Sequence, residues 1–476
     1  MADEDGLSPK QFGASFKGFL ESMASAEPKQ EPFFLKLIRE HFGTDPSLLP
    51  AVAERLSMNE HPNVQVALDA VLARPGTTSE LIGVRAGNPY DGLTLSGLTA
   101  SGGGSLHSLS TRGPVAYANV TLHDETVLPC VESGIWLVKK DGVPLVVLVC
   151  GANRIAVRES LTLEVMAAER PAADAFLGEL RRAMGQLSVY RGRVVSLVSG
   201  DGSRGNRIRF HRLPEVSRDD IILPSGLLEK IERDSLSFVR HTERLRAAGR
   251  HLRRGLLLHG PPGTGKTLTA MYLASQLTGH TIVLLTGRSL GLIEQSCRIA
   301  RLLEPSVVVI EDVDLVAQDR ERAGSSSPLL FELLNQMDGL SEDARVLFLL
   351  TTNRPEVLEP ALAARPGRID QVLEVPLPDA DCRRRLFDLY GKGLKLEVTR
   401  MDSVIKRTEK ASGAFIRELL RKAAVLAAEA GPAVSPERDP IVPKLIVRDE
   451  HLEQALGEIV SEAGGLARAF LGFRLD

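Results

Sequence analysis

The sequence is poor in the features that mark stapled, secreted or membrane-embedded proteins. Its four cysteines are scattered through 476 residues, without the spacing of a metal site or the density of a disulfide framework. No run approaches the ~18 consecutive apolar residues that a membrane span requires, and the N-terminus is acidic, unlike a targeting segment. The formal net charge is −3, so no general basic field favours nucleic acid as a partner. We therefore expect a cytoplasmic protein with reduced thiols and no membrane partner.

The chain has an ordinary globular composition, 43% hydrophobic and 25% charged, and is long enough for several domains. Apolar stripes at helical spacing predict that residues 1–82 form a helical segment. The stretch from Gly83 to Gly113 is rich in Gly, Ser and Thr and predicts a linker or loop. Residues 114–205 are expected to form a small α/β domain.

Several local signals support this small domain. Asp141-Gly142 separates two apolar runs and favours the type I′ turn of a β-hairpin. Pro144 in the second run indicates an edge strand, because proline cannot donate to a strand ladder. A helix is predicted from Pro171 to Met184, and the Gly- and Ser-rich stretch 199–203 predicts a domain boundary. No arrangement of catalytic residues is visible before residue 206.

The most specific motif is Gly-Pro-Pro-Gly-Thr-Gly-Lys-Thr at residues 260–267, which follows an apolar run and precedes a segment of helical periodicity. Strand, glycine-rich loop and helix in this order predict a phosphate-binding loop, because the glycines let backbone N–H groups face phosphate oxygens and the helix N-terminus favours an anion. Lys266 is expected to reach the β- and γ-phosphates, and the Thr267 hydroxyl to bind Mg²⁺. We therefore expect ATP and Mg²⁺ as cofactors. The expected nucleotide contacts are Gly260, Pro261, Pro262, Gly263, Thr264, Gly265, Lys266, Thr267 and Leu268.

Strands and helices are predicted to alternate after this loop. Apolar runs at 281–286, 307–310 and 345–350 are rich in leucine and β-branched residues, which is typical of parallel strands buried on both faces. From residue 381 onward the pattern becomes helical. We predict an α/β fold with a P-loop NTPase parallel sheet in residues 206–380 and a helical lid in residues 381–476.

Two carboxylates follow the predicted strand at 307–310. Glu311 and Asp312 come at its carboxyl end, where α/β sheets place ligands. We expect one carboxylate to hold Mg²⁺ and the next to position the attacking water, because phosphoryl transfer depends on placement and charge neutralisation. The alternative is a solvated acidic loop.

Further segments, within about residues 215–460, resemble those of the AAA family of ATPases. They are Asp220-Ile221, Leu333–Leu340, Thr351-Thr352-Asn353, Ala361–Asp370, Val375–Asp381 and Ser412-Gly413-Ala414. On these motifs the chain is identified as an AAA ATPase with a single module of bacterial type, preceded by an N-terminal region of unassigned role.

The resemblance implies roles for individual residues. Asn353 corresponds to the family's sensor-1 asparagine, Glu311 would face Mg²⁺, and Asp312 would position the water. Arg365 and Arg368 would reach the nucleotide of a neighbouring subunit, which implies a ring, by resemblance a hexamer. Taken alone, the two arginines could be surface cations after a Pro-Gly turn. The adenine contacts that the resemblance implies are Ile221, Gly413 and Ala414.

The sequence departs from the family pattern at two informative places. Most members have Asp-Glu where this chain has Glu311-Asp312, which shortens the water-positioning side chain by one methylene. The segment between Gly287 and Ile293 lacks the aromatic residue of the family's pore loop. Two functions are favoured. One is an ATP-driven remodeller of protein targets chosen by residues 1–205, and the other is a nucleotide-dependent regulatory scaffold with slow or vestigial hydrolysis. A third, a nucleic-acid motor, has weak support, because the arginines at 253–254 and 383–385 are explained as well by solvation of a loop and a helix start.

Overall fold

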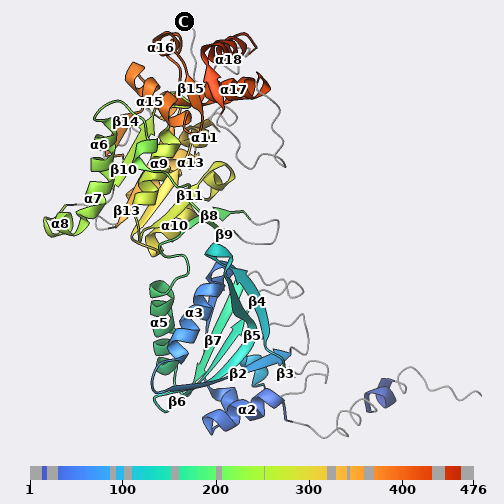
Figure 1. The fold of residues 1–476 in the computed structure, drawn as a ribbon. Coiled ribbons are helices and arrows are strands. Elements are labelled where there is room, and N and C mark those ends of the chain that lie inside the picture. Colours follow the sequence, from blue (N-terminus) through green and yellow to red (C-terminus); the bar gives the residue numbers. More distant parts are fainter. Residues whose placement is uncertain are drawn as a thin grey trace, which may run out of the picture. The chain divides into compact units, whose positions relative to one another are not determined.

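The computed structural model divides into two compact units, residues 1–121 with 127–186 and residues 122–126 with 187–476 (Figure 1). Within them it describes residues 13–18, 31–85, 93–100, 110–151, 160–199, 206–250, 252, 254–318, 328–339, 344–358, 369–430 and 445–462. No helix in these described ranges is long and apolar enough to cross a membrane.

The first unit is built on an antiparallel seven-stranded sheet with the order β1-β7-β6-β5-β2-β3, in which β4 also pairs with the long strand β5. Its strands are β1 (Ala51–Ser57), β2 (Thr77–Arg85), β3 (Thr111–Gly113), β4 (Ala116–Thr121), β5 (Val127–Lys140), β6 (Val143–Cys150) and β7 (Ser160–Ala167). Its helices are α2 (Phe33–Phe42), α3 (His61–Leu72), α4 (Leu95–Leu98) and α5 (Arg170–Gln186).

Helices cover both faces of this sheet, so its central strands are apolar on both sides. Along β6, Leu145, Val147 and Val149 pack with α3 and α5, whereas the alternate residues Val146 and Leu148 pack with α2 and α4. The sheet therefore has two hydrophobic cores, one on each face.

The predicted hairpin is confirmed, and the inference from Pro144 is wrong. Ile135 pairs with Leu148 across the turn, and Asp141 and Gly142 have φ of 50° and 84°, as a type I′ turn requires. However, β6 lies between β5 and β7 and is no edge strand. Pro144 is tolerated because the pairing of β6 with β7 begins one residue later, at Leu145.

The divisions expected at 82/83 and 113/114 are not boundaries in this structure. Strands β1 and β2 interrupt the predicted helical segment, and both belong to the sheet that residues 114–205 were expected to build alone. The predicted linker begins inside β2, where a Cβ on Gly83 would lie 2.4 Å from the carbonyl oxygen of Pro114. Gly83 therefore lets the two segments pack closely. Composition alone assigned this glycine to a linker, whereas close packing is the physical reason for it. The most Gly-rich part, residues 101–105, lies outside the described residues.

The second unit contains the predicted parallel sheet, with the order β14-β10-β13-β12-β11-β8-β9 and an antiparallel pair β8–β9 at one edge. Its strands are β8 (Val194–Val198), β9 (Arg207–His211), β10 (Arg254–His259), β11 (Thr281–Leu285), β12 (Ser306–Ile310), β13 (Val346–Thr352) and β14 (Gln371–Glu374). Its helices are α6 (Leu227–Glu232), which continues as a π-helical turn (Arg233–Ser237) into α7 (Phe238–Arg240), then α8 (Thr242–Ala247), α9 (Lys266–Gln276), α10 (Ile293–Leu302), α11 (Val313–Gln318) and α13 (Pro328–Asp338). Strands β8 and β9 flank residues 199–203, so the domain boundary expected there is also wrong, and the unit begins near Leu187.

Helices pack on both faces of this sheet. Helices α10 and α13 contribute to one core, and α6 and α9 contribute to the other. The strands β10, β12 and β13 are therefore buried on both faces, as their continuous apolar sequences predict.

The lid follows as a helical group with its own core (Figure 1). It contains α15 (Ala380–Tyr390), α16 (Met401–Arg407), α17 (Gly413–Ala430) and α18 (Asp449–Glu462). The prediction of a wholly helical lid misses one feature, a short parallel pair formed by β15 (Lys395–Glu397) and β16 (Ile446–Arg448).

Candidate nucleotide-binding site

The glycine-rich loop connects the end of β10 to the first turn of α9, in the order that the sequence predicts. Gly260, Gly263 and Gly265 have φ of 146°, 75° and 97°, a region that disfavours residues with a Cβ. At Gly260 a Cβ would also lie 2.2 Å from the carbonyl oxygen of Val375. The loop is therefore tightly folded between β10 and the segment that follows β14.

Lys266 is buried at the start of α9. Its Nζ donates hydrogen bonds to the carbonyl oxygens of Gly260 (2.9 Å) and Pro261 (2.7 Å). Burial lowers the pKa of Lys266 to about 8, and the nearby carboxylates of Asp312 and Asp314 oppose this shift. A phosphate group could replace these carbonyl acceptors and would favour the charged ammonium.

The carboxylates after β12 lie beside the end of β13. Asn353 donates from Nδ2 to Asp312 Oδ1 at 2.9 Å, which brings together two residues separated by 41 positions. Burial raises the pKa of Asp312, with a further increase from Asp314, whereas Lys266 and Asn353 lower it. Burial and the charge of Asp312 raise the pKa of Glu311. This accumulation of negative charge at a strand end favours binding of a cation.

The described residues contain no group of three or more His, Cys, Asp or Glu side chains that could hold a metal by themselves. Near the loop, the structure brings the carboxylates of Asp312 and Asp314 close to Lys266. Thr267 is exposed in the first turn of α9, and Glu311 directly precedes Asp312. Such a small set of oxygen donors suits Mg²⁺, which keeps several waters and binds through one or two protein ligands plus phosphate oxygens. The residues present therefore fit Mg²⁺ held jointly with a nucleotide.

A pocket lies beside the loop, where an adenine base would be expected. It is lined by residues that the sequence analysis expects to contact the nucleotide, namely Ile221, Gly263, Thr264, Gly265, Leu268 and Gly413. Several further lining residues were not identified from the sequence, among them Pro376, Pro378, Leu386 and Tyr390. The first two belong to a quoted motif, but nothing in the sequence points Leu386 or Tyr390 toward the loop, because these residues come from the lid helix α15.

The lid contacts the phosphate loop directly. The backbone N–H of Ala414 donates to the carbonyl oxygen of Gly263 at 3.1 Å. A Cβ on Gly263 would lie 2.7 Å from Ser412 Oγ and 2.8 Å from Ala414 Cβ, so this contact requires glycine. The position of the lid is thus coupled to the loop that would hold the phosphates.

Other predicted site residues have mixed outcomes. Thr264 donates to the carbonyl oxygen of Pro261 at 3.0 Å and stabilises the loop. Arg365 and Arg368 lie outside the described residues, so their reach toward a nucleotide stays a prediction. The segment Gly287–Leu292 is a 3₁₀ helix in which Leu292 is buried.

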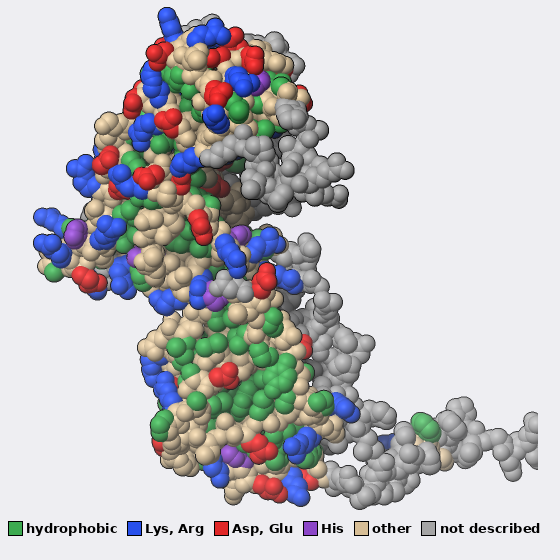
Figure 2. All heavy atoms as spheres, in the orientation of Figure 1, with side chains coloured by type: hydrophobic (Ala, Val, Ile, Leu, Met, Phe, Trp, Pro, Cys, Tyr) green, Lys and Arg blue, Asp and Glu red, His purple; other side chains and the backbone are tan. Residues whose placement is uncertain are grey.

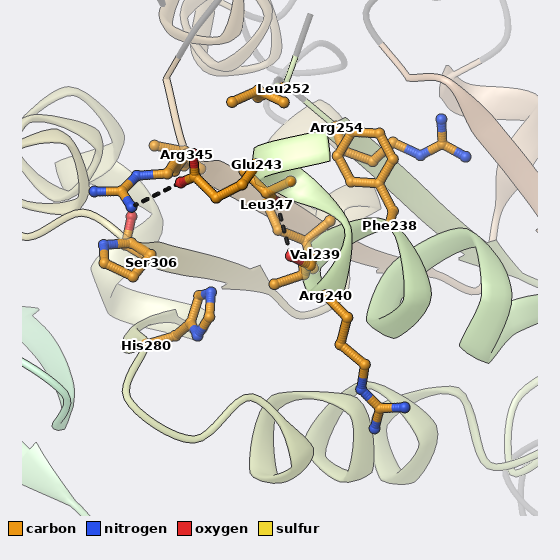
Figure 3. A pocket seen from close by; sticks show the side chains of 13 residues that line it. Phe238, Val239, Arg240, Glu243, Leu252, Arg254, His280, Ser306, Arg345 and Leu347 are labelled. Carbon is orange, nitrogen blue, oxygen red and sulfur yellow. Dashed lines mark hydrogen bonds and ion pairs between the residues drawn. The ribbon is translucent and has the colours of Figure 1, made fainter. Parts of the chain in front are cut away.

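A second cleft lies at the opposite, amino edge of the parallel sheet (Figure 3). Two of its arginines form ion pairs: Arg345 with Glu243 at 3.9 Å, and Arg254 with Asp234 at 3.5 Å. Arg254 also lies over the ring of Phe238, 4.8 Å from its centroid. The cleft has no glycine-rich loop, and ligands of such sheets bind at the carboxyl ends of strands. It is therefore distinct from the nucleotide site.

Comparison with known proteins agrees with this geometry. Residues 256–377 match the family model described as "ATPase family associated with various cellular activities (AAA)". Residues 256–377 form an AAA domain. This stretch runs from β10 to the segment after β14, so the phosphate loop, the two carboxylates and Asn353 all belong to the AAA domain.

Curated relatives match over a similar part of the chain. ATP-dependent zinc metalloprotease FtsH 2 of Sphaerobacter thermophilus is 33% identical over 225 residues, 45% of this chain and 34% of that protein. 26S proteasome regulatory subunit S10B homolog B of Arabidopsis thaliana is 33% identical over 203 residues, 40% of this chain and 49% of that protein. Proteasome-activating nucleotidase of Pyrococcus horikoshii is 31% identical over 230 residues, 45% of this chain and 57% of that protein. The chain thus spans between about a third and just over half of the length of these relatives.

Proposed function

We propose that this protein hydrolyses ATP and uses the cycle to remodel protein targets chosen by its N-terminal unit. The observation that carries the proposal is the meeting of Lys266, Asp312 and Asn353 at the carboxyl edge of the parallel sheet, next to a loop built for phosphate. The three relatives, named as a protease, a proteasome regulatory subunit and a proteasome-activating nucleotidase, support a role that acts on proteins.

The residues would act in the following way. Lys266 exchanges its carbonyl acceptors for phosphate oxygens, which restores its full positive charge in the site. Asp312, held by Asn353, accepts a hydrogen bond from the attacking water and orients it toward the γ-phosphate. Thr267 and Glu311 are the expected holders of Mg²⁺, which supplies charge neutralisation at the phosphates. The adenine base is surrounded by Ile221, Gly413, Ala414 and the newly identified Tyr390.

Assembly completes the proposed site. Arg365 and Arg368 would each reach the nucleotide of a neighbouring subunit, because a guanidinium carries a fixed charge in a geometry suited to phosphate oxygens. Hydrolysis then depends on a ring, which we propose to be a hexamer in the cytoplasm. Figure 2 shows basic side chains gathered at the end that carries α7 and α8, and mixed charges over the rest of the visible surface of the second unit. With a net charge of −3, this small basic area does not favour nucleic acid as the target.

The test is phosphate release by purified protein with ATP and Mg²⁺. Lys266→Ala should abolish turnover, whereas the matched control Lys230→Ala, which changes an exposed lysine of α6, should not. Turnover that persists in Lys266→Ala would refute the site. Asp312→Asn should keep ATP bound, so a protein target should co-purify with this variant. The target should no longer co-purify when Lys266→Ala is added to Asp312→Asn. The same target should increase the rate of phosphate release by the wild-type protein.

The second candidate is a regulatory scaffold whose assembly depends on bound nucleotide. The shorter carboxylate at Asp312 favours it, because a water-positioning group withdrawn by about an ångström can cost a large part of the rate. In this case nucleotide would change the assembly state while phosphate release stayed near background and did not respond to any partner.

A further inference from the structure

The end of β13 carries two threonines whose side chains are completely buried beside the catalytic carboxylates. Thr351 and Thr352 both have 0% exposure, and Asp314, in the first turn of α11, has 4%. Buried hydroxyl and carboxylate groups are costly unless they are hydrogen-bonded. Their partners therefore show what they stabilise.

Each of these side chains holds a backbone group of a candidate catalytic residue or its neighbour. Thr351 Oγ1 accepts a hydrogen bond from the backbone N–H of Asp312 at 3.1 Å. Asp314 Oδ1 accepts from Thr352 Oγ1 at 2.9 Å and from the backbone N–H of Asn353 at 3.3 Å. The Thr352 hydroxyl in turn accepts from the N–H of Arg354 at 3.0 Å. The backbone at Asp312 and at Asn353 is thus held by buried side chains, while the two side chains bond to each other.

Asp312 needs such a restraint because its backbone is in the left-handed region, with φ of 50°. This conformation is disfavoured for residues with a Cβ, although aspartate tolerates it better than most. Without the hydrogen bond to Thr351, the backbone could relax and carry the carboxylate away from Asn353. Held strain of this kind is common where a catalytic group must be pre-positioned.

We propose that Thr351, Thr352 and Asp314 form a clamp of positioning residues that keeps Asp312 and Asn353 in register for the attacking water. The proposal rests on the ATPase function proposed above and adds three residues to it. The clamp acts on the geometry of the hydrolytic step and leaves nucleotide binding to the phosphate loop and lid. It therefore predicts an effect on kcat with little effect on KM.

The test compares threonine variants of matched shape. Thr351→Val and Thr352→Val keep the volume and remove the hydroxyl, whereas Thr351→Ser and Thr352→Ser keep the hydroxyl. We expect the valine variants to lose about 10- to 100-fold in kcat, the effect of losing a buried hydrogen bond, with KM for ATP and affinity for ADP within about twofold of wild type. The serine variants should stay within about threefold in kcat. Thr408→Val is the control, since Thr408 is equally buried, its hydroxyl donates to the carbonyl oxygen of Val404 in α16, and it does not line the nucleotide pocket.

A double-mutant cycle separates positioning from packing. If Thr352 acts through Asn353, then adding Thr352→Val to Asn353→Ala should cost little beyond Asn353→Ala alone. The clamp would be overturned if the effects of Thr352→Val and Asn353→Ala on kcat were fully additive. It would also be overturned by valine variants with wild-type kcat, or by valine variants that lose ADP affinity in parallel with kcat. If the wild-type protein hydrolyses ATP and Asp312→Asn does not, these outcomes refute the clamp alone. If the wild-type protein does not hydrolyse ATP, the proposed function fails and the clamp fails with it.

Discussion

Replacing Gly263 by alanine should separate the phosphate loop from the lid, and its cost can be worked out from the structure. At a φ of 75° an L-residue is disfavoured by about 1–2 kcal/mol. The new Cβ would lie 2.7 Å from Ser412 Oγ and 2.8 Å from Ala414 Cβ, so the start of α17 must move away. This movement breaks the hydrogen bond from Ala414 to Gly263, which contributes about 0.5–1.5 kcal/mol.

The free protein can accommodate the alanine by letting the lid shift, but the nucleotide needs the loop and Gly413 together. Most of the cost should therefore appear in binding, as a loss of about 2–3 kcal/mol, or roughly 30- to 150-fold in affinity. Calorimetric titration with ADP measures this directly. Gly226→Ala is the matched control, because Gly226 has a φ of 80° and no atom within 4 Å of its added Cβ, and it lies outside the pocket. Wild-type ADP affinity in Gly263→Ala would refute the coupling of lid and loop.

Three further predictions follow from the same residues and from the N-terminal unit. Asp312→Asn should leave ATP bound but stop phosphate release, whereas Glu311→Gln should mainly raise the Mg²⁺ concentration needed for turnover. If Glu311→Gln alone blocks hydrolysis while the use of Mg²⁺ stays intact, the roles of Glu311 and Asp312 are reversed. Arg365→Ala and Lys266→Ala should each be inactive alone but regain part of the activity when mixed, because one subunit can supply the intact arginine and the other the intact loop; demonstrated mixed rings without activity would argue against action between subunits. Burial holds the pKa of His61 below its ordinary value, so the folded first unit binds fewer protons than the unfolded chain, and its stability should decline as the pH falls below about 6.5. The urea midpoint followed by the fluorescence of Trp136, the single tryptophan, should therefore fall between pH 7.5 and pH 5.5 in wild type and change less in His61→Gln.

Local sequence signals were sufficient for the centre of the nucleotide site. The glycine positions of residues 260–267 encode backbone conformation directly, and Glu311 and Asp312 directly follow a strand whose burial is visible in its composition. Because parallel strands bring their carboxyl ends to one edge, Asn353 at the end of β13 could be expected near Asp312, and the contact is present at 2.9 Å.

The parts that could not be predicted depend on contacts between distant segments. Tyr390 lines the pocket because α15 returns over the loop, and no spacing in the sequence encodes that return. No role was assigned to Asp314 from the sequence, and only the structure shows that it accepts hydrogen bonds from the end of β13. In the first unit, β1 and β2 lie far along the chain from β7 and β5, so pattern reading found the local hairpin and missed the sheet that contains it.

The segment Gly287–Leu292 leads to the last prediction, that this protein does not processively unfold stable proteins. Gripping an extended chain requires large side chains free to contact it, and aromatic residues serve best because they offer much apolar area at low entropic cost. This segment has no aromatic residue, and its bulky candidates are Leu290 and Leu292. Leu292 is only 9% exposed, which leaves it little surface to contact a substrate, and the side chain of Leu290 lies outside the described part of the structure. A fluorescent protein fused to the N-terminal unit should therefore keep its fluorescence during ATP turnover, while a bound partner is released. Loss of fluorescence that requires both ATP and Lys266 would overturn this reasoning. Leu292→Ala should lower the thermal stability of the second unit by the cost of a core truncation, about 2–5 kcal/mol, rather than act on a substrate.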